Sequence, residues 1–254
     1  MAYKIMLDAG HGGGDPGAVY EERKEKDDNL KLALAVGKIL EDNGVDVVYT
    51  RTEDVYQTPF EKAKLANEDG VDYFISFHRN SSPEPEQYQG AEVLVYDKKG
   101  IKYDMAENIL GALGKVGFKE LGVKARPGLV VLRRTKMPAL LIETGFINSK
   151  RDNELFDTRF SEITKGIANA ILGTLNEETV KGPVYYRVQT GVFRNRENAD
   201  RMLYSLSDEG YPAFILAEDD LYKVQVGAYM QLGNAVNMEQ RLRDSGYSTI
   251  IVTR

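Results

Sequence analysis

Short apolar runs alternate with segments of helical periodicity over the first 175 residues. Runs suited to buried strands occupy residues 3–7, 45–50, 73–77, 91–96, 129–132 and 139–142. Between them, apolar positions recur at helical spacing in residues 28–40, 58–69, 103–116 and 161–175. The second of these helices has clear end signals, with Thr58 as N-cap, Pro59 in the first turn and Gly70 after its end. The alternation predicts an α/β fold, a twisted, mostly parallel sheet covered by helices on both faces.

A different pattern begins after residue 176. A polar stretch ending in Gly182-Pro183 has linker composition and separates residues 1–176 from residues 184–254, with 177–183 as the linker. Beyond it, Tyr186-Arg-Val-Gln-Thr-Gly-Val-Phe193 aligns with Tyr222-Lys-Val-Gln-Val-Gly-Ala-Tyr229 at a shift of 36 residues. Each copy is typical of a strand, a helix and a second strand. The repeat therefore predicts a small βαββαβ domain at the C-terminus.

Composition narrows the functional classes. The 254 residues carry a net charge of -6, without the basic excess that binding to nucleic acid requires. The absence of cysteine excludes thiol nucleophiles, cysteine-ligated zinc and disulfides. No stretch approaches the roughly 20 apolar residues that span a bilayer, and the N-terminus has no signal-peptide profile. We therefore expect no nucleic acid or membrane partner, and a chain made without an export signal or trimmed of one.

The chain has only two histidines, and both follow predicted strands. His11 lies in a glycine-rich turn after the first strand, and His78 directly follows the third, at residues 73–77. Glu143 follows the last strand in the same way. Open α/β sheets bind ligands at the carboxyl ends of their strands. The sequence thus places three side chains that could bind a metal or transfer a proton at the carboxyl edge of the predicted sheet.

The glycines at positions 10, 12, 13 and 14 allow a sharp turn and a close approach to a ligand. A phosphate-binding loop is the alternative, but such a loop needs Gly-Lys-Ser/Thr or Gly-x-Gly-x-x-Gly at the start of a helix. A zinc site with an open position has three protein ligands, so two histidines require one carboxylate. Spacing alone leaves six carboxylates open: Asp8, Asp15, Glu21, Glu22, Glu25 and Glu143.

Five segments resemble the zinc-dependent N-acetylmuramoyl-L-alanine amidases of type 3. They occur in the family's order between residues 3 and 175: Asp8-Ala-Gly-His-Gly-Gly-Gly-Asp-Pro-Gly-Ala18, Glu25-Lys-Asp-Asp-Asn-Leu30, Arg51-Thr-Glu-Asp54, Phe74-Ile-Ser-Phe-His-Arg-Asn-Ser81 and Met137-Pro-Ala-Leu-Leu-Ile-Glu-Thr-Gly-Phe146. The resemblance implies one zinc ion per chain, held by His11, Glu25 and His78, with Glu143 as the catalytic carboxylate. It also implies hydrolysis of the amide between N-acetylmuramic acid and L-alanine in peptidoglycan.

Other residues near these motifs are weaker candidates. Arg79 stands where the family carries a small residue, and we expect it to alter substrate contacts. Asn80 and Arg133 are further candidates for substrate binding. Arg51 is expected to be a structural partner, because arginine does not exchange protons near neutral pH.

The C-terminal repeat resembles SPOR (sporulation-related repeat) domains through Tyr186-Arg-Val-Gln189 with Gly191 and Tyr222-Lys-Val-Gln225 with Gly227. The resemblance implies binding to peptidoglycan glycan strands, with Phe193 and Tyr229 as candidate stacking residues. An RNA-binding sheet is the alternative, but residues 183–254 contain eight basic and nine acidic residues, so the module is not basic.

Together these features predict a two-domain enzyme that acts on the bacterial cell wall, either a monomer or a dimer. Two rivals are a non-catalytic wall-binding protein with the same fold and a zinc deacetylase or peptidase acting on the same polymer. The missing export signal suggests accumulation in the cytoplasm until lysis, as in mother-cell amidases of sporulation and phage lytic amidases.

Overall fold

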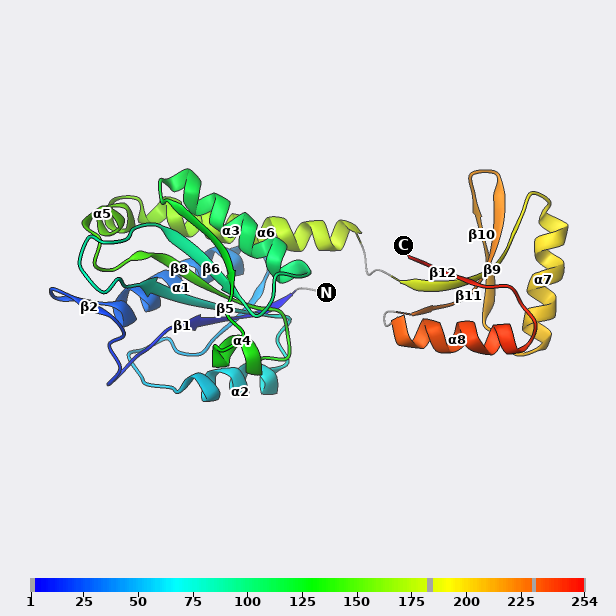
Figure 1. Ribbon diagram of the computed structural model, residues 1–254, viewed down its shortest axis with the longest axis horizontal. Coiled ribbons are helices and arrows are strands. Elements are labelled where there is room, and N and C mark those ends of the chain that lie inside the picture. Colours follow the sequence, from blue (N-terminus) through cyan, green and yellow to red (C-terminus); the bar gives the residue numbers. More distant parts are fainter. Residues whose placement is uncertain (1–2, 182–184, 230–231, 254) are drawn as a thin grey trace. The chain divides into compact units, whose positions relative to one another are not determined.

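The computed structural model describes residues 3–181, 185–229 and 232–253 (Figure 1). The chain divides into two compact units, Met1–Glu177 and Glu178–Arg254, and each is described by itself. Among the described residues, no helix combines the length and the apolar character needed to cross a membrane.

The larger unit is built on a six-stranded sheet with the strand order β4-β1-β5-β8-β6-β7. Neighbouring strands are parallel except β6 and β8, which pair antiparallel. This arrangement confirms the mostly parallel α/β fold. The strands are β1 (Lys4–Ala9), β4 (Asp46–Tyr49), β5 (Tyr73–Asn80), β6 (Ala91–Val95), β7 (Glu120–Ala125) and β8 (Ala139–Phe146), and a separate hairpin pairs β2 (Val19–Tyr20) with β3 (Arg23–Lys24).

Helices cover both faces of this sheet (Figure 1). The larger hydrophobic core lies under α1, α3, α5 and α6, and a smaller one lies under α2 and α4 on the opposite face. The six helices are α1 (Glu25–Asp42), α2 (Pro59–Asp69), α3 (Ile101–Val116), α4 (Val130–Arg134), α5 (Lys150–Thr158) and α6 (Phe160–Lys181). The predicted coverage of both faces is thereby confirmed.

Alternation along the strands decides which face carries the polar side chains. In β5, Ile75 and Phe77 belong to the larger core, whereas Phe74 belongs to the smaller one. Since successive side chains point to opposite faces, His78 lies on the side of α2 and α4, as does Glu143 in β8. The candidate chemistry is therefore concentrated on one face of the sheet at its carboxyl edge.

Helix α2 matches the prediction at both ends. The Thr58 hydroxyl accepts from the backbone N–H of Glu61, and the Glu61 carboxylate accepts from the backbone N–H of Thr58, which completes a capping box. Gly70 ends the helix in the left-handed region with φ 63°. These local signals are independent of the rest of the fold, which is why the sequence shows them directly.

Two elements differ from the prediction. Residues 129–132 were expected as a strand, but Leu129 is the N-cap of the short helix α4, in which Val131 and Leu132 pack into the smaller core. A short apolar run has no periodicity that separates a buried strand from one helical turn. Edge strand β7 was not predicted, since only Val123 is buried within it and the run lacks an apolar stripe.

Helix α6 also runs further than predicted. It extends to Lys181, so residues 177–181 of the expected linker are helical. Asn176-Glu-Glu-Thr-Val-Lys181 contains neither glycine nor proline, and the first helix-breaking pair is Gly182-Pro183. Residues 182–184 lie outside the described part of the chain.

The smaller unit has a four-stranded antiparallel sheet with the order β10-β11-β9-β12 and both helices on one face. Its elements run β9 (Tyr186–Phe193), α7 (Arg196–Asp208), β10 (Ala213–Glu218), β11 (Leu221–Tyr229), α8 (Leu232–Asp244) and β12 (Ile250–Thr253), which confirms the βαββαβ order. The two repeats meet at the centre of the sheet, where Gln189 and Gln225 are register partners.

Candidate metal centre

Three side chains from separate elements converge at the carboxyl edge of the larger sheet. His11 follows β1, His78 lies near the end of β5, and Glu25 is the first residue of α1. One ligand atom from each lies within 4.8 Å of the others, and this is the group of His, Asp and Glu in the described chain that could hold a metal ion. The structure thus brings together the three residues that the family resemblance assigned as ligands.

Glu25 is the centre of this group. Its Oε2 lies 3.2 Å from His11 Nε2, and its Oε1 lies 2.8 Å from His78 Nδ1. Burial alone would raise the pKa of Glu25, but the hydrogen bonds and charges of the two imidazoles outweigh burial and hold that pKa well below its usual range. An ionised carboxylate and two imidazoles together form a suitable set of donor groups for zinc.

Asp15 holds the His11 ring from behind. The His11 Nδ1 to Asp15 Oδ2 distance is 2.8 Å, and the Gly17 backbone N–H donates to Asp15 Oδ1 at 3.0 Å. This contact leaves His11 Nε2 facing Glu25. A carboxylate behind a ligating histidine orients the ring and increases its basicity. The sequence offered Asp15 only as a possible ligand, because spacing does not show which side of the ring it occupies.

The other carboxylates considered as ligands are engaged or distant. Asp8 is fully buried and accepts hydrogen bonds from Thr50 and Ser76, with Lys62 Nζ 2.8 Å from its Oδ1. Glu21 and Glu22 are exposed between β2 and β3. Neither position brings a carboxylate into the His11–Glu25–His78 group.

The backbone around His11 is constrained to a rare conformation. His11 itself has φ 60°, in the left-handed region that non-glycine residues rarely occupy. Gly10 lies against the His78 ring so closely that an added Cβ would lie 2.4 Å from its Nε2. The missing side chain at Gly10 therefore lets the two histidines approach, with ring centroids 5.0 Å apart.

Glu143 lies beside this group without a partner of its own. It is the register partner of His78 on the adjacent parallel strand, and its Oε2 is buried with no hydrogen-bond partner in the described structure. Burial, together with the negative charges of Glu25 and Glu92, raises the pKa of Glu143 to about 7, although His78 opposes the shift. An uncommitted carboxyl group with a pKa near neutrality is suited to accept and return a proton.

A cavity of about 280 Å³ opens on the two histidines. His11, Asp15 and His78 line its polar side. Its other wall is apolar and comes mainly from the loop before α4 and from α4 itself: Pro59, Leu129, Val130, Val131 and Leu141. The segment that the sequence misassigned as a strand thus forms a wall of the candidate site.

Arg51 has the structural role that the sequence predicted. It is buried and donates hydrogen bonds to the backbone carbonyls of Ala9, Gly10, Lys26 and Glu53. These bonds tie the turn that carries His11 to the start of α1, which carries Glu25.

Arg79 corrects an expectation. Its side chain is only 2% exposed, which contradicts a role in contacting substrate. Its guanidinium pairs with Asp28 at 2.5 Å, donates to Asn153 at 2.7 Å and stacks 4.4 Å from the centroid of the Phe156 ring. Because side chains alternate along β5, the neighbour of His78 points to the opposite face, where it holds α1 and α5 to the sheet.

Asn80 and Arg133 lie in different places. Asn80, at the end of β5, donates to Glu92 Oε1 at 3.1 Å and lines a polar depression together with Glu92, the register partner of Glu143. Arg133 is exposed on α4 and lines another depression, with Tyr96 and Lys136, in which neither histidine takes part. Substrate contact remains a prediction for both residues, and Asn80 has the position that favours it.

Phe193 and Tyr229 also correct an expectation. Both rings are half-buried and pack against the hydrophobic core under α7 and α8, so they lie on the helix-covered face of the sheet and not on its open face. Gly191 and Gly227 make room for them, since an added Cβ would lie 2.6 Å from Phe193 and 2.3 Å from Tyr229. The opposite face of the sheet carries the alternate positions, among them Gln189 and Gln225.

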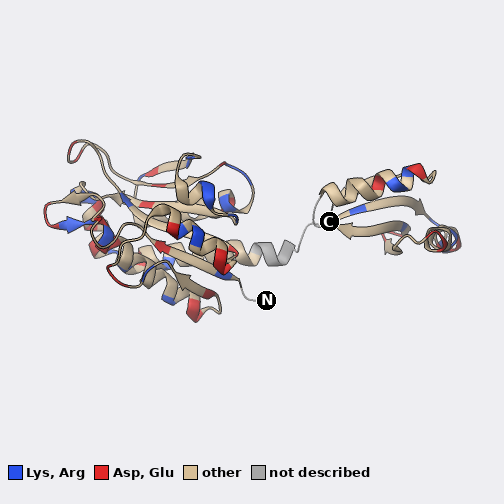
Figure 2. Ribbon diagram, turned by 90° about the horizontal axis from the view of Figure 1, so that it is seen from below, with Lys and Arg blue, Asp and Glu red and all other residues tan. Residues whose placement is uncertain are grey.

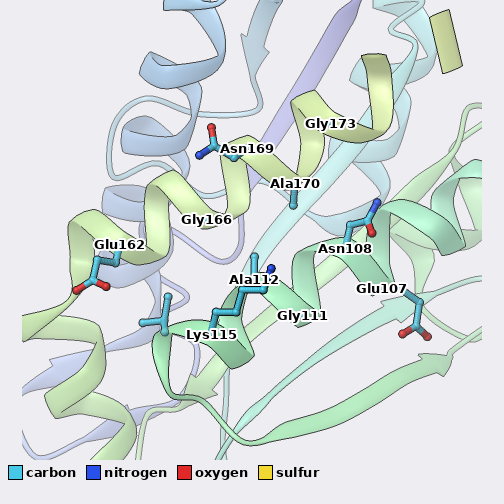
Figure 3. A pocket seen from close by; sticks show the side chains of 11 residues that line it. Glu107, Asn108, Gly111, Ala112, Lys115, Glu162, Gly166, Asn169, Ala170 and Gly173 are labelled. Carbon is cyan, nitrogen blue, oxygen red and sulfur yellow. The ribbon is translucent and has the colours of Figure 1, made fainter. Parts of the chain in front are cut away.

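A larger depression, of about 630 Å³, lies between α3 and α6 (Figure 3). Small residues such as Gly111, Gly166 and Gly173 line much of it, and Gly166 lets α6 pack on Ala112. Both helices cover the larger core, on the face opposite His78. The depression contains no histidine, so the candidate chemistry remains at the strand ends.

The sheet edge therefore defines a class of protein before any comparison. Two imidazoles and one carboxylate that could hold a metal ion, with a second, unpaired carboxyl group beside them, form the type of site found in metal-dependent hydrolases.

The similarity of this chain to known proteins supports assignment to a class of hydrolases. Residues 5–173 match the family model of N-acetylmuramoyl-L-alanine amidase, and residues 182–253 match that of the SPOR domain. The chain belongs to the N-acetylmuramoyl-L-alanine amidase family. It is 34% identical over 222 residues, 85% of each chain, to the sporulation-specific N-acetylmuramoyl-L-alanine amidase of Bacillus subtilis.

Two further relatives support the assignment. An endolysin of Bacillus phage SPP1 is 35% identical over 189 residues, covering 72% of this chain and 69% of the endolysin. The crystal structure of an N-acetylmuramoyl-L-alanine amidase from Clostridium difficile 630 superposes with a TM-score of 0.66 at 29% identity, covering 70% of this chain and 98% of that one. Two of these three relatives are named as N-acetylmuramoyl-L-alanine amidases, and the third is named as an endolysin.

Proposed function

We propose that the chain hydrolyses the amide bond between N-acetylmuramic acid and the L-alanine of the stem peptide, with one zinc ion held by His11, Glu25 and His78. The donor set fits, because catalytic zinc commonly has three nitrogen or oxygen ligands from the protein and leaves a fourth position for water or substrate. The observation that carries the proposal is the buried, unpaired Oε2 of Glu143 beside His78.

When bound, zinc lowers the pKa of a coordinated water to about 7 and polarises a carbonyl group. Glu143 takes the proton from the attacking water and returns it to the alanine nitrogen as the amide breaks. Its pKa of about 7 suits both steps. Asp15 keeps the His11 ring oriented throughout.

The apolar wall of the cavity supports a substrate with small aliphatic groups next to the bond that breaks. The lactyl group and the alanine each carry one methyl group next to the amide. Leu129, Val131 and Leu141 offer an apolar surface for such groups within a cavity of about 280 Å³. Exclusion of water by this wall also strengthens the interactions of the charged groups inside the site.

For the smaller unit, we propose binding to peptidoglycan glycan strands through the sheet face that bears Gln189 and Gln225. Gln189 is partly exposed on this face, and the buried Gln225 donates to its Oε1 at 3.5 Å. Amide groups of this kind pair with sugar hydroxyl groups and need no basic surface. The ribbon of this unit carries both Lys or Arg and Asp or Glu and is mostly neither (Figure 2).

Product analysis tests the reaction. Purified peptidoglycan is incubated with the zinc-loaded full chain, and the products are examined by mass spectrometry for stem peptides with a free alanine amino group. Release of acetate, or cleavage within the stem peptide, would instead identify a deacetylase or a peptidase. Wall binding without any product would identify a non-catalytic binding protein.

A further inference from the structure

A second depression, with a volume of about 610 Å³, lies along the same sheet edge, and its lining includes Glu92, the register partner of Glu143. It extends from the end of β5 to the start of β7, and its lining includes Asn80, Tyr88, Glu92, Lys119, Lys124 and Phe146. In contrast to the cavity at the histidines, this lining is rich in charged and amide groups.

The reversed direction of β6 creates this arrangement. Glu92, at the start of β6, is the register partner of Glu143 near the end of β8. Strand β7 runs parallel to β6, so Lys119, just before β7, lies at this edge as well, and its carbonyl accepts from the Ala91 N–H at 2.8 Å. The strand order thus extends the candidate site from Glu143 toward two lysines.

The acidic groups of this depression already have partners. Glu92 accepts from Asn80 and pairs with Lys124. The Glu86 carboxylate accepts from the backbone N–H of Lys150 at the start of α5. Lys119, in contrast, is exposed and has no acidic partner among the described residues. Lys119 is therefore the charged side chain of this lining that is left without a hydrogen-bond or ionic partner among the described residues.

An aromatic wall faces this charge. Tyr88 is 54% exposed, and its ring lies 6.1 Å from that of Phe146 between ring centroids. Side-chain amides from Gln87 and Gln89 also line the depression. Aromatic surface, amide groups and one available cation suit a peptide that carries a free carboxylate.

We propose that this depression is the stem-peptide subsite and that Lys119 recognises a carboxylate on the second residue of that peptide. The inference rests on the proposed amidase function, because it takes the bond between sugar and peptide to break at Glu143. The sugar then lies toward His11, and the peptide runs across β8, β6 and β7.

The spacing of the strands is consistent with a peptide that runs from β8 to β7. Strands β8 and β7 are separated by two strand spacings, or about 10 Å. Two residues of an extended peptide cover about 7 Å. A charge-assisted hydrogen bond from a lysine adds about 2.8 Å. A peptide that starts at Glu143 therefore brings its second residue within reach of the β7 side of the edge.

The test compares two soluble N-acetylmuramyl dipeptides that differ only in one group of the second residue, a free carboxylate or a carboxamide. We expect the full, zinc-loaded chain to prefer the carboxylate by about twofold to fivefold in kcat/KM, the upper part of the range for one exposed ion pair. The difference should lie in KM, since Lys119 is remote from the reacting atoms. Lys119→Gln should abolish the preference, and Lys119→Glu should reverse it.

Lys115→Gln is the matched control, since Lys115 is an exposed lysine that lines the depression between α3 and α6 (Figure 3). It should retain the preference for the carboxylate. Cleavage of both dipeptides at equal kcat/KM, or an unchanged preference in Lys119→Gln, would overturn the subsite and leave the amidase function intact. If neither dipeptide yields an alanine-terminated product, the amidase proposal fails and the subsite fails with it.

Discussion

His78 and Glu143 are register partners on adjacent parallel strands, β5 and β8, and both lie on the face of the sheet that bears α2 and α4. Neighbouring strands are about 4.8 Å apart, so the backbone alone places a candidate metal ligand next to a candidate proton acceptor. The relationship links sequence positions 78 and 143 without depending on a loop.

Glu143→Gln should retain zinc and lose nearly all turnover. The amide has almost the same shape as the carboxylate but cannot accept a proton, and general acid–base groups contribute about 10²- to 10⁴-fold in rate. Zinc content and release of stem peptide are measured on the same preparation. Hydrolysis near the wild-type rate would exclude Glu143 as the proton acceptor.

His11→Ala and His78→Ala should each lose stoichiometric zinc after dialysis, because two remaining ligands rarely hold zinc in a site built for three. Glu25→Ala should behave in the same way, since its carboxylate lies between both imidazoles. Zinc content and thermal unfolding are measured for each variant, so that loss of the metal is distinguished from loss of the fold. Unchanged zinc affinity in Glu25→Ala would transfer the third ligand to another carboxylate, with Asp15 as the nearest to His11.

Gly10→Ala should weaken zinc binding by about tenfold or more, the effect expected when support for a ligand is disturbed. The new Cβ would lie 2.4 Å from His78 Nε2 and would displace the ring. Gly14→Ala is the control from the same loop, because no atom lies within 4 Å of its added Cβ. Equal zinc affinities in the two variants would show that the His78 ring position is not critical.

Asp28→Asn should destabilise the larger unit by about 3 kcal/mol, since it leaves the buried Arg79 guanidinium without its carboxylate. The free energy of unfolding is obtained from denaturant titration. Asp42→Asn, at the exposed end of the same helix, should cause no measurable change, because the pair of Asp42 with Lys38 is exposed to solvent. Similar losses in both variants would indicate that Arg79 is stabilised mainly by Asn153 and Phe156.

Removal of residues 183–254 should leave zinc binding and hydrolysis of soluble muramyl peptides nearly unchanged. Every proposed catalytic residue lies before residue 150, and α6 ends at Lys181. Activity on whole sacculi should fall by about tenfold or more, because tethering to glycan raises the local concentration of substrate. A folded, zinc-loaded truncation that no longer hydrolyses soluble peptides would mean that the smaller unit contributes to the active site.

The sequence by itself determined the features that depend on local pattern. Apolar runs marked the strands that end near His11, His78 and Glu143, and the rule that α/β sheets bind ligands at carboxyl ends placed the three together. Capping residues fixed α2, and self-similarity at 36 residues fixed the order of the small domain. These patterns predict the structure correctly because each depends on the residues of one segment and not on contacts with distant segments.

Only the tertiary structure decided the features that depend on direction and contact. It turned Arg79 into the interior, packed Phe193 and Tyr229 under the small sheet, and placed the helix of residues 130–134 against the candidate metal cavity. The reversal of β6 brought Glu92 to Glu143. A one-residue step changes the face that a side chain occupies, and strand direction depends on how distant segments pack, so neither property is written in a local stretch of sequence.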